Sequence, residues 1–206
     1  MSGDLAASPS ALDEEDRARA DIYALLARLY YRGPDAQFLE LMAQTGAADG
    51  GDNPSTITRT WKSLSRIASG IDAAAAQQEH DDLFVGTGRA EVSPYATFYL
   101  AQTGREKILV GLRQELEAMG LSRKETSREP EDHFAGLFDV MRHLVEQGSG
   151  DVALQNQRGF FERYLLRSYA AFCDEIEMSG RAEFYGQVAA LTRAFLDVEK
   201  EALYMV

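Results

Sequence analysis

Apolar residues recur every three or four positions along almost the whole chain, and this spacing is what most constrains the fold. Ile22, Leu25 and Leu29, for example, share one face of a helix that Gly33 and Pro34 then end. Strict alternation of apolar and polar residues, the pattern of a strand, is rare. The spacing predicts helices at about 13–32, 38–45, 54–67, 71–85, 104–119, 129–147, 151–178 and 182–203.

One stretch, residues 92–100, leaves a strand interpretation open, although Pro94 inside it weakens that interpretation. The predicted fold class is therefore all-α, with one compact multi-helix domain over residues 11–206. Residues 1–10 are rich in Ser, Ala and Gly, which is typical of a flexible N-terminal arm.

The polar stretch 122–128 is a candidate hinge between two helical lobes, at about 11–121 and 129–206. A short hinge of this kind permits one lobe to be exchanged between two copies of the chain. We therefore expect a monomer or a domain-swapped homodimer.

The charge balance limits the partners. The 206 residues contain 21 Lys+Arg and 33 Asp+Glu, which gives a formal net charge of −12. Such a chain repels a nucleic-acid backbone and attracts basic ligands. No apolar run approaches the ~20 residues of a membrane span, so we expect no stable membrane insertion. Cys173 has no partner for an internal disulfide and is expected to be buried, which favours a reducing, cytoplasmic location.

Motifs of the common catalytic and metal sites are missing. Gly86 and Gly88 lack the third glycine and the Lys-Ser/Thr ending of a phosphate-binding loop. His80 and His133 lie next to acids, but adjacent residues of a helix point about 100° apart, whereas helical metal sites use spacings of three or four. We expect no catalytic residue, no bound metal and no cofactor.

Two other segments are unusual. The first is an irregular loop crowded with aromatic residues, with Leu83-Phe84-Val85-Gly86 followed by Pro94-Tyr95 and Tyr99-Leu100. The second is Glu129-Pro130-Glu131-Asp132-His133, which places three carboxylates and an imidazole at the expected start of a helix. Helix dipole effects account for acids at a helix start but not for the histidine.

In these two segments the sequence resembles the TorD/DmsD/NarJ family of cytoplasmic redox-enzyme maturation chaperones. Members similar to this chain carry L-F-x-G, a short spacer, P-Y or P-W and then Y-L. They also carry E-P-x-D-H followed by a Met eight residues after the His, which here is Met141. The resemblance covers roughly residues 20–200.

The resemblance implies an all-helical chaperone, not an enzyme. Its partner would be the twin-arginine signal peptide, or an equivalent N-terminal segment, of the apo form of a molybdenum-containing oxidoreductase subunit. The chaperone would aid cofactor insertion and delay export. Such a peptide carries two arginines and an apolar run, so its receptor needs carboxylates beside an apolar groove.

The resemblance also assigns residues to these roles. Glu129, Glu131 and Asp132 would meet the arginines, and His133 would orient Asp132 or cap a backbone carbonyl. The groove would be formed by the first motif, with these residues: Phe84, Gly86, Pro94, Tyr95 and Tyr99.

Two other functions remain open. An enzyme would use Asp132 and His133 as an acid/base pair or as metal ligands. A structural assembly subunit would instead stay bound to its client after cofactor loading.

Overall fold

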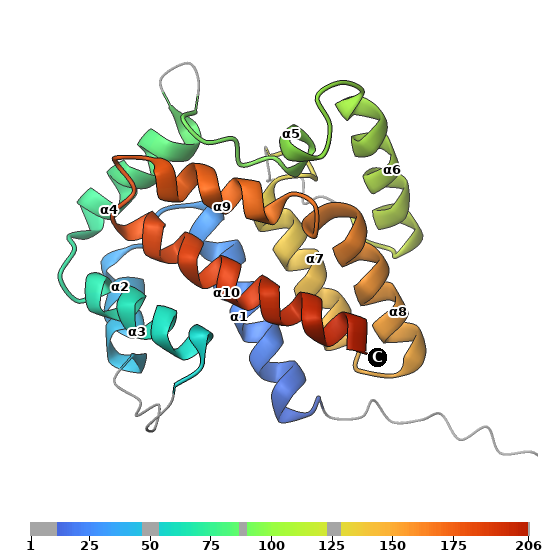
Figure 1. Ribbon diagram of the computed structural model, residues 1–206, viewed down its shortest axis with the longest axis horizontal. Helices are drawn as coiled ribbons and strands as arrows, with labels where there is room; N and C mark the ends of the chain where they lie inside the picture. The colour runs from blue at the N-terminus through green and yellow to red at the C-terminus, as the bar shows by residue number, and fades with distance from the viewer. Residues whose placement is uncertain (1–11, 47–53, 87–89, 123–128, 206) are drawn as a thin grey trace, which may run out of the picture.

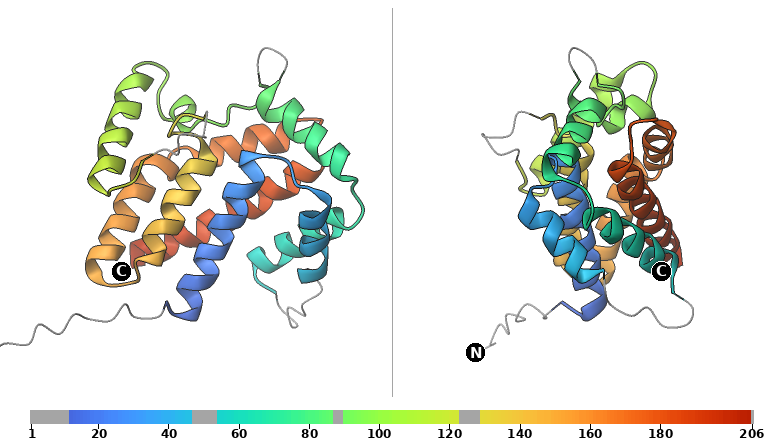
Figure 2. Two further views of the ribbon diagram at one scale, coloured as in Figure 1. Left: turned by 180° about the vertical axis from the view of Figure 1, so that it is seen from behind. Right: turned by 90° about the vertical axis from the view of Figure 1, so that its left-hand side faces the viewer.

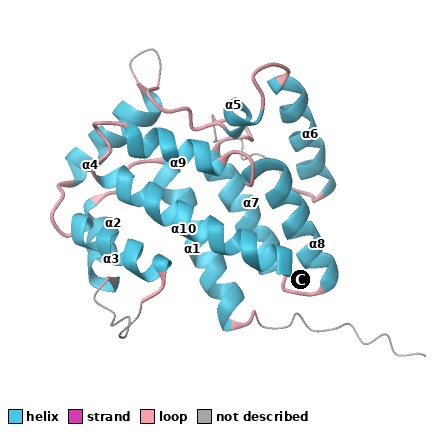
Figure 3. Cartoon of the chain, viewed as in Figure 1, coloured by secondary structure: helices cyan, strands magenta, loops and turns pink. Residues whose placement is uncertain are grey.

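Every regular element is a helix in the part of the chain that the computed structural model describes, residues 12–46, 54–86, 90–122 and 129–205. The elements are α1 (Glu14–Tyr31), α2 (Ala36–Thr45), α3 (Thr56–Ala68), α4 (Ala73–His80), η1 (Asp81–Val85), α5 (Ala96–Leu100), α6 (Arg105–Ala118), α7 (Phe134–Glu146), α8 (Asp151–Phe160), η2 (Phe161–Leu165), α9 (Tyr169–Met178) and α10 (Phe184–Met205). The predicted all-α class is confirmed (Figure 3). Within the described ranges, no helix has the length and hydropathy to cross a bilayer.

Polar residues just before the apolar patterns set the helix starts. The side chains of Asp13, Asp35, Ser55 and Asp72 each accept a hydrogen bond from a backbone N–H in the first turn of α1, α2, α3 and α4, respectively. These caps satisfy N–H groups that have no partner within the helix. Helix starts are thus fixed locally, by residues that the sequence makes visible.

Helices from distant parts of the chain pack together. The helix α1 lies along α7, and the long α10 packs against α3 and α9 (Figure 1). Seen from behind, α6, α8, α7 and α1 lie next to one another, and α2, α3 and α4 occupy the opposite end (Figure 2). One continuous core therefore holds the described helices together.

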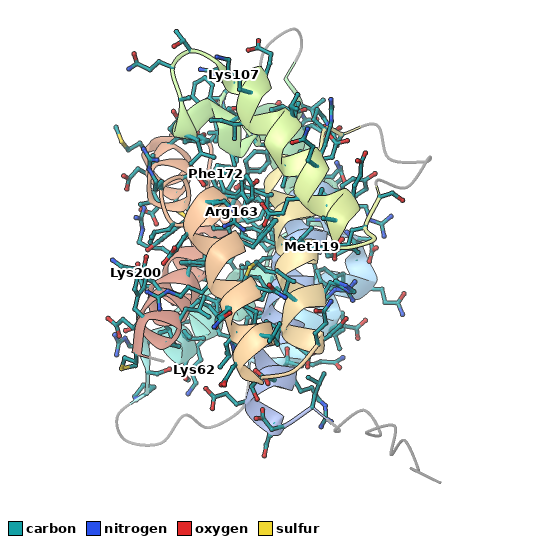
Figure 4. All side chains as sticks on the ribbon, turned by 90° about the vertical axis from the view of Figure 1, so that its right-hand side faces the viewer. Lys62, Lys107, Met119, Arg163, Phe172 and Lys200 are labelled. Carbon is teal, nitrogen blue, oxygen red and sulfur yellow. The ribbon has the colours of Figure 1, made fainter. Side chains whose placement is uncertain are left out.

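Aromatic rings fill the centre of this core. The rings of Phe134 on α7 and Phe172 on α9 stack with centroids 4.0 Å apart. Tyr30 on α1 contacts Phe84, whose ring centroid is 5.8 Å away, and Phe172, at 5.1 Å. Figure 4 shows Phe172 among packed side chains, while Lys107 and Lys200 lie at the periphery. Cys173 is buried beside this cluster, as predicted, and burial raises the pKa of its thiol to about 12.

The two predicted lobes pack against each other, since α1 from the first lobe lies on α7 from the second. Of the predicted hinge 122–128, only Ser122 lies within the described residues, and the predicted arm 1–10 lies outside them. The hinge and the domain swap stay predictions.

Three helix predictions need correction. The expected helix 151–178 is divided into α8, the π-helical turn η2 and α9. It breaks where the Ser168 hydroxyl donates to the backbone carbonyls of Tyr164 and Leu165, in competition with the helical pattern. The expected helix 71–85 likewise begins at Ala73 and ends in the π-helical turn η1.

The third correction concerns the second motif. The predicted helix start at Glu129 is wrong, because α7 begins at Phe134 and residues 130–132 form a turn. The N-cap residue is His133, whose Nδ1 accepts a hydrogen bond from the backbone N–H of Ala135 at 3.1 Å. The acids of the motif therefore precede the helix and do not form its first turn.

Candidate functional site

The two motifs meet in the structure. Residues Tyr95 and His133 form an isolated antiparallel bridge, the only β-type pairing among the described residues. The Ala96 N–H donates to the Asp132 carbonyl, and the Phe134 N–H donates to the Pro94 carbonyl, both at 2.9 Å. The sequence left open whether residues 92–100 form a strand. In the structure they form an extended stretch with a single bridge, followed by the short helix α5. The bridge also brings the aromatic loop next to residues 129–132, which we call the acidic turn.

Asp132 ties the acidic turn to the start of α5. Its side chain is almost fully buried, and its Oδ2 accepts a hydrogen bond from the Thr97 hydroxyl at 2.6 Å. The Thr97 backbone N–H also points to this oxygen, at 3.4 Å. The carboxylate thus stabilises the contact between the two motifs, a role that the sequence analysis did not assign to it.

His133 is buried between the motifs. Its ring contacts the Tyr95 ring edge to face, with centroids 5.5 Å apart. Burial lowers the pKa of the imidazole to about 4, so the ring is neutral at pH 7. Its Nδ1 accepts from the Ala135 amide, so the imidazole caps a backbone N–H, and the expectation that it orients Asp132 or caps a carbonyl stays a prediction.

Both glutamates of the second motif are held by other side chains. The Tyr95 hydroxyl donates to Oε2 of Glu129 at 2.7 Å, and the Arg113 Nε donates to Oε2 of Glu131 at 2.9 Å. Burial and the Glu129 carboxylate together raise the pKa of Tyr95. Carboxylates therefore lie beside the aromatic loop, as the resemblance implies.

The remaining residues of the first motif lie in different surroundings. Phe84 is buried in the aromatic core against Tyr185, with centroids 5.2 Å apart, and Pro94 is also buried. The Tyr99 hydroxyl faces α9 and donates to Glu175 at 2.7 Å. Gly86 ends η1 with φ +61° and ψ +157°, a conformation essentially restricted to glycine.

A pocket of about 290 Å³ lies where the motifs meet, and we call it the motif pocket. It includes Tyr95 and Asp132 from the predicted set. Its other lining residues come from the loop, α5, α6 and the second motif, namely Ser93, Thr97, Phe98, Arg105, Glu106, Leu109 and Pro130. Sequence reasoning missed the contribution of α6, because Leu109 fits the apolar stripe of its helix and carries no signal for a pocket.

A second cavity, of about 510 Å³, lies beside Gly86. Its acidic residues are Asp81, Asp82 and Glu91, and Arg181 is the basic residue in its lining. Glu91 and Ser93 are two residues apart, so the same chain segment borders both cavities. Among the described residues, no group of three or more His, Cys, Asp or Glu side chains is arranged to hold a metal ion.

Asp132→Ala is expected to lower the free energy of unfolding by about 1.5 to 3 kcal/mol, because the buried Thr97 hydroxyl loses a charged acceptor. Asp132→Asn keeps an acceptor oxygen and should cost less. Urea unfolding followed by circular dichroism measures both effects. Asp139→Ala, at an exposed position on α7, is the control and should change stability by less than about 1 kcal/mol. Equal stability of Asp132→Ala and wild type would contradict the structural role of this carboxylate.

Comparison with known proteins identifies relatives over most of the chain. Chaperone protein TorD of Vibrio cholerae serotype O1 (strain O395) is 27% identical over 201 residues, which cover 90% of this chain and 91% of that protein. Chaperone protein TorD of Shewanella oneidensis is 26% identical over 203 residues, which cover 91% of each chain. That of Colwellia psychrerythraea is 25% identical over 230 residues. These relatives carry the name of a chaperone, the class that the family resemblance implies.

A family model described as nitrate reductase delta subunit matches residues 51–174, which include the aromatic loop, the acidic turn and α6. The match covers more than half of the chain, and the resemblance stated from the motifs is confirmed. The chain therefore belongs to the nitrate reductase delta subunit family.

Proposed function

We propose that this protein is a chaperone that binds the twin-arginine signal peptide, or an equivalent N-terminal segment, of a molybdenum-containing oxidoreductase subunit. It holds the apo subunit, aids cofactor insertion and delays export. The observation that carries the proposal is the bridge between Tyr95 and His133, which joins both motifs at the motif pocket. The family membership and the relatives named TorD support it.

The chemistry of the pocket suits a segment with basic and apolar residues. Phe98 and Leu109 offer apolar surface, while Glu129 and Glu131 lie in the acidic turn beside it. An apolar side chain of the segment would enter the motif pocket and an arginine would reach the acidic turn. Burial of one leucine-sized side chain supplies about 1.5 to 3 kcal/mol, and charge-assisted hydrogen bonds add specificity.

Titration of synthetic peptides tests this function. A twin-arginine peptide should bind, its Lys-Lys variant should bind more weakly, and a scrambled peptide of equal charge should bind least. Added salt should slow association, because the net charge of −12 attracts the basic peptide. Equal affinity for the scrambled peptide would contradict recognition of the sequence.

Two variants on one helix test the location. Leu109 faces the motif pocket, whereas the neighbouring Val110 is about half exposed. Leu109→Asn should weaken twin-arginine peptide binding about tenfold, and Val110→Asn should leave it unchanged. Melting temperatures of both variants show whether a loss reflects unfolding. Full affinity in a folded Leu109→Asn protein would move the site away from this pocket.

The variant Asp132→Asn tests whether the Asp132 carboxylate binds an arginine of the peptide or only stabilises the contact to Thr97. If the Asp132 charge meets an arginine, the folded variant binds the peptide more weakly. If the carboxylate serves the contact to Thr97 alone, peptide affinity stays at the wild-type level.

Capture of the client distinguishes a chaperone from a structural assembly subunit. A chaperone should co-purify with the apo oxidoreductase subunit and be released after the cofactor is loaded. Persistent association with the loaded subunit would favour the structural role.

A further inference from the structure

Arg105 lines the motif pocket at the start of α6. Its Nε donates to the Ala101 carbonyl at 2.9 Å, and its guanidinium carbon lies 4.7 Å from the centre of the Phe98 ring. Because Phe98 is itself part of the pocket lining, these two contacts hold the guanidinium at the pocket wall. The chain itself therefore fixes the position of this charged group.

The two terminal nitrogens of Arg105 are available as hydrogen-bond donors. A guanidinium has five N–H donors, and among the described residues only the Nε of Arg105 has an acceptor. Other arginines that contact α6 do have carboxylate partners, since Arg113 pairs with Glu131 and Arg163 pairs with Glu115. Within the described ranges Arg105 forms no ion pair.

The position of Arg105 is unfavourable for a basic residue. It is the first residue of α6, where the helix dipole favours an acidic side chain and disfavours a basic one. The residue before the helix is Gly104, which supplies no side-chain cap. Residues that break a local rule in this way are typical of functional sites.

The position of Arg105 along α6 relates it to the acidic turn. Arg105, Leu109 and Arg113 follow one another at intervals of four residues, so they share one face of the helix. Leu109 in the middle lines the motif pocket, and Arg113 at the far end donates to Glu131 of the acidic turn. A segment whose arginine reaches the acidic turn and whose apolar side chain contacts Leu109 would therefore bring main-chain carbonyls near Arg105.

From these contacts we infer that Arg105 donates hydrogen bonds to a main-chain carbonyl of the bound segment and thereby fixes the register of that segment in the motif pocket. This inference rests on the proposed function and concerns recognition at the same site. A carbonyl suits this position better than a carboxylate, because the chain has a net charge of −12 and repels acidic groups. Main-chain hydrogen bonds supply affinity, while the side chains of the segment supply specificity.

Calorimetric titration of the full chain with a twin-arginine peptide tests the role of Arg105. Arg105→Gln should lower the affinity about tenfold, the effect of one lost charge-assisted hydrogen bond. Arg105→Lys keeps the charge without the planar group and should lose only part of the affinity. Lys107→Gln removes the same charge from an exposed position on α6 (Figure 4) and should bind like wild type. Unchanged melting temperatures show that the variants are folded.

Peptides with one ester bond in place of an amide locate the contacted carbonyl. An ester carbonyl is a weaker acceptor, so at one position the ester should lower the affinity of wild type several-fold and that of Arg105→Gln less. The N–H that the ester also lacks affects both proteins alike, so the difference between them reports the contact to Arg105.

Three results would overturn the inference while the wild-type protein still binds the peptide. These are wild-type affinity in a folded Arg105→Gln protein, equal losses in both proteins for every ester, and a gain in wild-type affinity from an aspartate in the apolar run, which would indicate a carboxylate ligand. Failure of the wild-type protein to bind the twin-arginine peptide would instead overturn the proposed function, and the inference with it.

Discussion

Glu199→Ala is expected to lower the free energy of unfolding by about 3 to 5 kcal/mol, the usual cost of breaking a buried ion pair. Glu199 is 2% exposed and accepts hydrogen bonds from Arg19 Nε at 2.7 Å, Arg19 Nη2 at 2.9 Å and the Tyr23 hydroxyl at 2.9 Å. Alanine would leave the Arg19 guanidinium, whose side chain is 14% exposed, without its main partner. Chemical denaturation at pH 7 measures the loss.

The controls distinguish burial from charge. Asp174 forms an exposed pair with Arg193, so Asp174→Ala should change stability by no more than about 1 kcal/mol. Glu199→Gln keeps an acceptor oxygen for the Tyr23 hydroxyl and should therefore lose less stability than Glu199→Ala. Equal effects of Glu199→Ala and Asp174→Ala would show that the buried network contributes no more than a surface pair.

The second large effect is a pH dependence set by His133. Its pKa is about 4 in the folded protein, while an unfolded chain takes up this proton near pH 6.5. Between these values the unfolded state binds more protons, so stability is complete above pH 6.5 and falls as the pH drops towards 4. The full loss is about 3 kcal/mol, with no further loss below pH 4. Burial is the main physical reason, because a buried imidazolium is poorly solvated, and protonation also removes the Nδ1 lone pair that accepts from the Ala135 amide.

His133→Asn isolates this effect. Asparagine is a good N-cap that accepts the same backbone hydrogen bond and does not titrate. As the pH falls from 7 to 4, the wild type should therefore lose more stability than the variant. Urea unfolding at several pH values measures it. Parallel loss of stability in both proteins would mean that His133 is not the responsible group.

The two motifs show how much of the candidate site could be predicted from the sequence. The motif residues were recognisable, and the prediction that both motifs belong to one site agrees with the bridge between Tyr95 and His133. Their individual roles were not predictable. Asp132 and His133 are adjacent in sequence, yet one side chain points to α5 and the other to the first turn of α7.

The sequence by itself determined the helical class and most helix boundaries, because periodicity and capping depend on residues three or four positions apart. Asp13, for instance, at the predicted start of the first helix, caps α1 through the N–H of Asp16. The tertiary structure alone decided which charges meet. Arg19 and Glu199 are 180 positions apart, and Arg113 and Glu131 are 18 apart on separate elements. With 33 acidic residues in the chain, every arginine has many chemically equivalent partners, and only the packing of the helices selects among them.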